Sequence, residues 1–363
     1  MCGGRFGPIA PTITDVPRAA TLIRLPIVIA CALLLDGPGA SGVNPQNGRP
    51  FAAQVAALSE PGGFFDTDNL ISNERSYLDV LPGLDGAGVR GGAYVGVGPD
   101  QNFSYIAHIR PAIAFVVDIR RDNLLLHLLF KALFEQARTR IEYMGLLFGR
   151  PVPRDGAGWR DESIERLAAY IDGIAANPRA PDGLDRRTRA VIARFGVPLS
   201  EADFATIGRF HRTFVTAGLG LRFETTGRPP QPHYPSYRDL LLAVDSRGRK
   251  GNFLATEEGF QFVKALQARD LIVPVVGDLA GPHALRAIAQ VMKDRRQPLS
   301  AFYTSNVEFY LDRAGTLEMF LENLGQMSRM REAVVIRSVF GRFGRGSTSV
   351  LEPVEELVAA RRR

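Results

Sequence analysis

One stretch of this chain limits its fold more than any other: Gly92-Ala-Tyr-Val-Gly-Val-Gly98, followed by Ala114-Phe-Val-Val-Asp118. Each is a short apolar run typical of a buried strand, and the residues between them predict a short helix that stops before Pro111. Glycines let a backbone approach a ligand, and an acid after the second strand can bind ribose hydroxyls. Gly96 and Asp118 are 22 residues apart, close to the spacing of about 20 for that role. The stretch therefore predicts a mononucleotide-binding βαβ unit.

The same alternation of strands and helices returns in the second half of the chain. Strand-like apolar runs lie at 271–278, 299–306 and 333–340, and helical patterns lie at 256–269, at 283–293, from 308 and at 317–324. Such alternation indicates a parallel sheet covered by helices. Leu124 to Leu147 is apolar all round and predicts one long buried helix. We expect an α/β protein with a mainly parallel Rossmann-like sheet, helices on both faces and a helical insertion.

Changes in composition divide the chain into five segments. We expect a signal-like or disordered extension at 1–50, the first half of the Rossmann-like domain at 51–150, a helical insertion at 151–235, the second half at 236–345 and a basic tail at 346–363. The first half opens with a polar segment in which Asp68 or Asn69 can cap a helix that runs to Val80. Residues 82–92 read as a turn-rich connection.

The N-terminal extension has the parts of a secretory signal. Arg18 and Arg24 precede an apolar run at 25–35, and small residues follow it. The run is shorter than the roughly 20 residues that a membrane-spanning helix needs, and no other segment is apolar enough to cross a membrane. A buried strand or an upstream extension explains the run equally well. We favour a cytoplasmic location unless residues 1–35 are an export or lipoprotein signal.

Charge and cysteine content exclude several classes of protein. The net charge is +6 and permits nucleic-acid binding, but the basic residues are scattered among acids, so we do not expect a nucleic-acid partner. Both cysteines, Cys2 and Cys31, precede the folded body, which therefore has no disulfide and no thiolate nucleophile. The histidines have no ligand spacing, and we expect no metal site.

Polar residues follow the expected strands at the end where parallel sheets bind ligands. They are Gly98-Pro99-Asp100-Gln101-Asn102 after the first strand, Asp118-Ile119-Arg120 after the second, Gly277-Asp278 after the third and Ser305-Asn306 after the fourth. Because these ends lie along one edge of a sheet, their coincidence predicts a nucleotide-type small-molecule site.

This order of glycine loop, acid-ended strand, Val-Val-Gly-Asp-Leu and Ser-Asn resembles class I S-adenosylmethionine-dependent methyltransferases over about 90–125 and 268–340. A second resemblance rests on Gly62 to Leu78, the glycine loop and Phe302 to Tyr310, which together are similar to an uncharacterised bacterial family with a Rossmann-like core. The methyltransferase resemblance implies that S-adenosylmethionine is the cofactor. It implies that Gly96, Gly98 and the loop residues Asp100 and Asn102 approach its methionine part, that Asp118 binds the ribose, that Asp278 lies near the adenine, and that Ser305 and Asn306 lie beside the transferred methyl group.

The chain departs from that family at the glycine loop. Tyr94 stands where the family has an acid, Asp100 replaces the third glycine, and Pro99 removes an N–H donor. Asp100 can repel a ligand carboxylate or cap the following helix instead. NAD also suits Asp118, although the glycine spacing is poor for it.

Other polar side chains are candidates for substrate binding or acid–base chemistry. Asp66, Asp68, Asn69, Asn73 and Glu74 either close over the pocket and bind substrate or serve turns and helix caps. Arg120 can bind a phosphate or carboxylate. His283 is the best acid–base candidate because it follows Asp278 across a short turn, whereas His127, in an apolar helix, reads as a hydrogen-bonded core residue.

Two classes of function remain open from the sequence. The first is a methyltransferase-like enzyme, which needs an aligned acceptor and a dry site but few ionisable groups. The second is a non-enzymatic ligand-binding or scaffold protein, envelope-associated if the N-terminus is an export signal. An open cavity at the loop favours ligand binding, and a cavity filled by Pro99, Tyr94 and neighbouring aromatics favours a scaffold.

Overall fold

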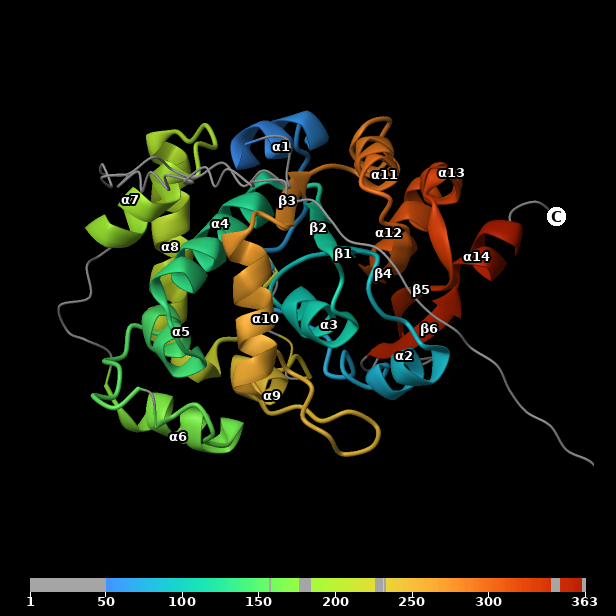
Figure 1. Cartoon of the computed structure of the whole chain (residues 1–363). Coiled ribbons are helices and arrows are strands. Elements are labelled where there is room, and N and C mark those ends of the chain that lie inside the picture. The colour runs from blue at the N-terminus through green and yellow to red at the C-terminus, as the bar shows by residue number, and fades with distance from the viewer. Residues whose placement is uncertain are drawn as a thin grey trace, which may run out of the picture. The chain divides into compact units, whose positions relative to one another are not determined.

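A single sheet organises the computed structural model, which describes residues 50–156, 158–175, 184–225, 231, 233–340 and 347–360 (Figure 1). The strand order is β3-β2-β1-β4-β5-β6. The strands are β1 Ala93–Val97, β2 Ile113–Asp118, β3 Ile272–Val276, β4 Leu299–Ser305, β5 Arg329–Phe340 and β6 Ser347–Pro353. All neighbours are parallel except β5 and β6, which are antiparallel. The expectation of a mainly parallel Rossmann-like sheet is confirmed.

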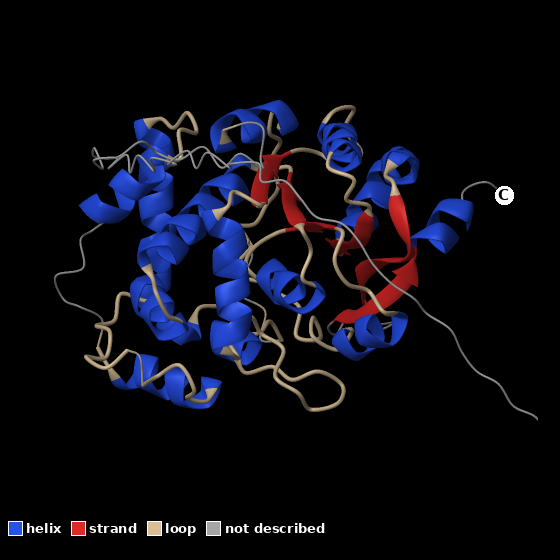
Figure 2. Ribbon diagram, in the orientation of Figure 1, coloured by secondary structure: helices blue, strands red, loops and turns tan. Residues whose placement is uncertain are grey.

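Helices cover both faces of this sheet, and Figure 2 shows them around the strands. They are α1 Phe51–Leu58, α2 Leu81–Ala87, α3 Gln101–Ile109, α4 Arg121–Gln136, α5 Arg140–Leu147, α6 Ile164–Gly173, α7 Arg186–Arg194, α8 Glu201–Ala217, η1 Gly218–Gly220, α9 Tyr237–Leu241, α10 Glu257–Ala268, α11 Ala284–Asp294, α12 Val307–Ala314, α13 Leu317–Gln326 and α14 Val354–Ala360. Helix α10 packs against α3 and α4, whereas α11 packs against α1 and α13. Crossovers between parallel strands are almost always right-handed, and with the strand order reversing after β3 this rule puts the two groups on opposite faces.

The apolar strands of the parallel sheet are buried, including β3 at its edge. Every residue of β1 and of β3 is buried, as expected where helices cover both faces of a parallel sheet. The predicted insertion is helical, and it shares the core of the sheet: Ile164, Leu167, Phe210 and Phe214 are all buried in it. The chain divides into Met1–Gly42 and Val43–Arg363, and all described residues belong to the second unit. The predicted extension at 1–50 therefore lies outside the described residues, apart from Pro50.

The helix expected from Asp68 or Asn69 to Val80 is absent. Side-chain oxygens of Thr67, Asp68 and Ser72 accept hydrogen bonds from the backbone N–H two residues further on. Such local bonds stabilise turns at the expense of helix. The expected loop at 82–92 instead contains α2, which has a proline in its first turn and ends at Gly88 with φ 70°, a common helix start and stop.

Two further expectations are wrong. The long helix at 124–147 is two helices, because Thr139 caps the second by accepting a hydrogen bond from the Glu142 N–H. The basic tail at 346–363 contains β6 and α14. Strand β6 has a weak apolar signal because it is an edge strand with exposed positions such as Val350, and Arg361–Arg363 lie outside the described residues. No helix in the described parts of the chain is long and apolar enough to span a bilayer.

Candidate functional site

A cavity of about 330 Å³ lies at the carboxyl ends of the parallel strands. Its walls include Gly98 after β1, Asp118 at the end of β2, Asp278 after β3, and Ser305 and Asn306 at the end of β4. The chain runs outward from β1 to β2 and β3, then crosses back to β4. The cavity therefore lies where the strand order reverses, which is the usual ligand position in such sheets. Its volume is near the lower limit of small-molecule sites, about 300 Å³.

The polar segment at 60–74 forms another wall of the cavity. The Glu60 N–H donates to the carbonyl of Val276 (2.9 Å), and the Gly63 N–H donates to that of Ile119 (2.8 Å). Asn69 and Asn73 line the cavity, whereas Asp66 and Asp68 do not. The asparagines thus face the cavity, whereas Asp68 serves a turn. Substrate binding by this segment stays a prediction. Burial raises the pKa of the Asp68 carboxyl.

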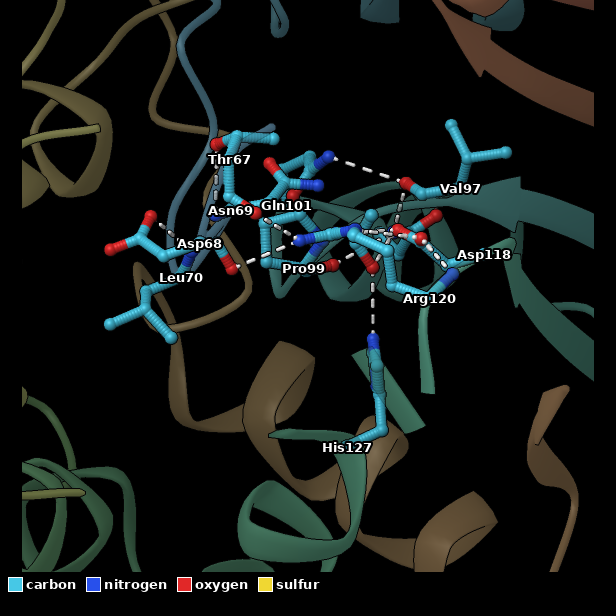
Figure 3. A network of polar contacts seen from close by, with 12 residues as sticks. Thr67, Asp68, Asn69, Leu70, Val97, Pro99, Gln101, Asp118, Arg120 and His127 are labelled. Atoms are coloured by element: carbon cyan, nitrogen blue, oxygen red, sulfur yellow. Dashed lines mark hydrogen bonds and ion pairs between the residues drawn. The ribbon is translucent and has the colours of Figure 1, made fainter. Parts of the chain in front are cut away.

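Arg120 fixes this segment to the end of β2 (Figure 3). Its Nε and Nη2 donate to both carboxylate oxygens of Asp118 (3.0 and 2.8 Å), and its Nη1 donates to the carbonyls of Thr67 (2.7 Å) and Asp68 (3.2 Å). The side chains of Asp118 and Arg120 are only 10% and 8% exposed. Arg120 was expected to bind substrate, but four of the five guanidinium N–H groups are already used. Arg120 is therefore first a structural clamp, with one N–H left.

Buried polar side chains fix the glycine loop through hydrogen bonds on the side that faces the protein interior. His127 Nε2 donates to the carbonyl of Gly98 (2.9 Å), as Figure 3 shows, and burial lowers the pKa of His127 to about 4. Asn102 Nδ2 donates to the carbonyls of Val97 (2.9 Å) and Pro99 (2.7 Å), and its Oδ1 accepts from Tyr94 Oη (2.8 Å). The interpretation of His127 as a hydrogen-bonded core residue is confirmed.

The expected ligand contacts of Gly96 and Asn102 are wrong. Gly98 lines the cavity with φ +81°, whereas Gly96 and Asn102 do not line it. A Cβ at Gly96 would lie 2.0 Å from Asn102 Oδ1 and 2.6 Å from Tyr94 Oη. Gly96 is therefore required by packing inside the protein. Tyr94 and Pro99 do not fill the cavity, which is open.

Asp100 also points away from the cavity, so its expected role in cofactor binding is wrong. It is 5% exposed, and its Oδ2 accepts a hydrogen bond from Tyr237 Oη (2.7 Å) on α9. Burial raises the pKa of Asp100 to about 6, although the bond from Tyr237 acts in the opposite direction. Asp100 ties the glycine loop to the end of the helical insertion.

The side chains of Asp278 and His283, which both follow β3, point to different parts of the structure. Asp278 lines the cavity, and its Oδ1 accepts from the Ala280 N–H (2.9 Å). His283 is exposed at the start of α11, and its Nε2 donates to the carbonyl of Ala57 (2.9 Å). The expected acid–base role of His283 is wrong, because the turn directs its side chain to α1.

The buried acid Glu74 lies behind Ser305. From the sequence alone it is only one member of the polar segment. Ser305 has φ +55° and donates its hydroxyl hydrogen bond to Glu74 Oε1. Glu74 is 1% exposed, burial raises its pKa, and its Oε2 has no hydrogen-bond partner among the described residues. The sequence signal was present in Ser72-Asn73-Glu74, but only the fold brings it to β4.

The cavity thus collects eight of the expected site residues and leaves seven outside. Inside are Asn69, Asn73, Gly98, Asp118, Arg120, Asp278, Ser305 and Asn306; outside are Asp66, Asp68, Glu74, Gly96, Asp100, Asn102 and His283. Wall residues that the sequence did not single out include Phe223, Leu311 and Thr316. The described residues contain no cluster of His, Cys, Asp or Glu that could hold a metal ion.

Fold and site together define a Rossmann-like α/β protein with a cavity at the point where its strand order reverses. A family model described as "Domain of unknown function (DUF7790)" matches residues 70–149 and 232–354, more than half of the chain. The chain belongs to this family. The unmatched residues 150–231 coincide closely with the helical insertion, so the family model covers the whole sheet and most of its flanking helices, but not α1. No curated protein matches the chain.

Proposed function

We propose that the cavity binds S-adenosylmethionine and that the protein is a methyltransferase-like enzyme. The observation that carries this proposal is the convergence of Gly98, Asp118, Asp278 and Ser305 on one cavity, each from a different strand end. Gly98 has no side chain and leaves room beside its backbone. Asp118 keeps acceptor capacity, because a carboxylate accepts about four hydrogen bonds and three come from Arg120.

The residues present fit the ligand in chemistry. Asp118 would bind ribose hydroxyls and Asp278 would lie near the adenine, while the remaining N–H of Arg120 suits the methionine carboxylate. When bound, S-adenosylmethionine supplies an electrophilic methyl group. The chain's part is to hold the ligand and exclude water, which the 60–74 segment favours by walling the cavity.

Calorimetric titration with S-adenosylmethionine tests the proposal. Wild-type protein is expected to bind, and Asp118→Asn and Asp278→Asn are expected to weaken binding about tenfold or more, the value of one hydrogen bond to a charged group. Asp122→Asn is the matched control, since Asp122 is half-exposed on α4 and outside the cavity. Wild-type protein that gives no heat with about 1 mM ligand refutes the proposal.

The alternative, a non-enzymatic ligand-binding protein, is favoured by the Arg120 clamp, which occupies most of the Asp118 carboxylate. The two are separated by incubating the protein with S-adenosylmethionine and a small-molecule cell extract. Formation of S-adenosylhomocysteine supports the enzyme, and binding without formation supports the alternative. An envelope-associated role depends on residues 1–35, which fractionation of the full chain tests.

A further inference from the structure

A second pocket, the groove, meets the cavity at Ser305 and Asn306. It measures about 380 Å³ and is also lined by Glu308, Phe309, Asp312, Leu317, Arg337, Ser338 and Val339. Ser305 and Asn306 line both spaces. A ligand in the cavity and a second ligand in the groove would therefore both reach the end of β4.

Charges in the groove favour a cation. Arg337 is shared between Glu308 (2.8 Å) and Glu352, so its charge is already compensated. Asp312 is exposed on α12 and has no ion pair among the described residues. Phe309 and Val339 are 44% and 46% exposed and give the groove apolar walls. A small cation with an apolar body matches these surroundings.

Glu74 adds a buried proton acceptor to this groove. It lies behind Ser305 of the groove wall, whose hydroxyl donates a hydrogen bond to Glu74 Oε1. Its Oε2 is buried without a partner, which is costly for a carboxylate unless a cation or proton compensates it. Burial raises the pKa of Glu74 above its ordinary value, which makes its carboxylate a stronger proton acceptor.

We propose that the groove binds a small primary amine with an apolar body, and that Ser305 and Glu74 take up its proton. The ammonium N–H gives its proton to Ser305 Oγ, and the Ser305 hydroxyl proton passes to Glu74 Oε1. An ammonium and a carboxylate thus become a neutral amine and a carboxylic acid. Ser305 is the catalytic residue and Glu74 its positioning residue. The assignment of the amine as methyl acceptor rests on the proposed function; its binding does not.

Titration of the protein alone with three probes tests this inference. 2-Phenylethylamine is expected to bind about tenfold more tightly than 2-phenylethanol, and 3-phenylpropanoate is expected to bind most weakly. Asp312→Asn should reduce the preference for the amine, and Asp294→Asn, which removes an exposed carboxylate on α11 outside both pockets, should not. Equal affinity for amine and alcohol overturns the inference.

The pH dependence of amine affinity distinguishes a role of Glu74 as proton acceptor from a role in packing alone. Affinity for the amine should rise as pH rises through the pKa of Glu74, because only the carboxylate can take the proton. The ionisable groups that interact with Glu74 are the phenols of Tyr94, Tyr105 and Tyr303, and burial raises the pKa of each. Glu74→Gln should abolish the rise and Glu74→Asp should partly restore it. An unchanged profile in a folded Glu74→Gln variant overturns the role of Glu74.

Titration of the same preparations with S-adenosylmethionine distinguishes the two proposals. Protein that prefers the amine but gives no heat with S-adenosylmethionine loses only the proposed function. Protein that binds S-adenosylmethionine without preferring the amine loses only this inference. Asp312 is a surface residue, so its variant keeps the test decisive if Glu74→Gln does not fold.

Discussion

Replacing Arg120 by Met is expected to be among the most damaging changes at the cavity. The substitution removes the ion pair with Asp118 and two hydrogen bonds to the carbonyls of Thr67 and Asp68. Asp118 would remain as a carboxylate with a side chain only 10% exposed. Loss of one partner of a buried ion pair costs about 3–5 kcal/mol, so we expect a decrease of this size in the free energy of unfolding.

Denaturant unfolding of Arg120→Met, Asp118→Asn and the double variant measures this effect. The double variant should lose less than the two single variants together, by at least about 1 kcal/mol, because it leaves no unpaired charge. Arg121→Met is the control: Arg121 is 47% exposed and pairs with Asp203, and such a pair is worth about 1 kcal/mol or less. Equal losses for the Arg120 and Arg121 variants would refute the reasoning.

Three further predictions concern the glycine loop, each checked by unfolding measurements. Gly96→Ala should destabilise by about 1–3 kcal/mol or more because its Cβ meets Asn102, whereas Gly86→Ala, with open space around it, should stabilise α2 slightly; equal effects would contradict the packing argument. Because the pKa of Asp100 is raised to about 6, the stability of wild-type protein relative to Asp100→Asn should fall by about 3 kcal/mol as pH rises from about 4 to about 6. Because the pKa of His127 is lowered to about 4, protonation of the folded protein is disfavoured, and the stability of wild-type protein relative to His127→Gln should fall as pH falls from about 6.5 to about 4. These two contributions oppose each other over the same pH range, so each is measured as the difference between wild type and its own variant. His127→Gln keeps an N–H donor and should lack this second dependence; a profile identical to wild type would contradict the assignment.

The sheet could be predicted from sequence because its strands are buried on both faces. Strands β1 to β3 are nearly continuous apolar runs, and β4 is interrupted by Ser300 and Thr304. Each strand ends in, or is followed by, Gly, Asp, Ser or Asn, and the order of these runs fixes the edge at which the cavity lies. Strand β6 was missed because an antiparallel edge strand alternates weakly: Thr348 and Val350 are exposed beside the buried Ser349. The turns at 66–74 were missed because Asp and Asn serve turns and helix caps equally well.

Cavity residues that stand at the end of a strand could be predicted from the sequence. The prediction failed where the direction of a side chain, or a contact with a residue far away in the sequence, decides the outcome. Gly98, Asp118, Asp278 and Ser305 end up in the cavity because backbone position alone places them there. Asp100 is two residues past Gly98, yet its side chain turns to Tyr237, which is 137 positions away. The spacing of residues in the glycine loop cannot show whether the Asp100 side chain points into the cavity or to Tyr237, because the sequence motif is the same in both cases.

The acid most directly linked to the end of β4 comes from outside the strand-end pattern. Glu74 reaches Ser305 across 231 positions because the 60–74 segment is attached to β3 at Val276 and to the residue after β2, Ile119. Arg120 adds a third attachment through Thr67 and Asp68. The clamp that occupies Asp118 therefore also holds the segment that carries Glu74. Because the clamp positions Glu74 in this way, Arg120→Met should weaken amine binding in the groove although Arg120 does not line it. Arg121→Met should leave that binding unchanged.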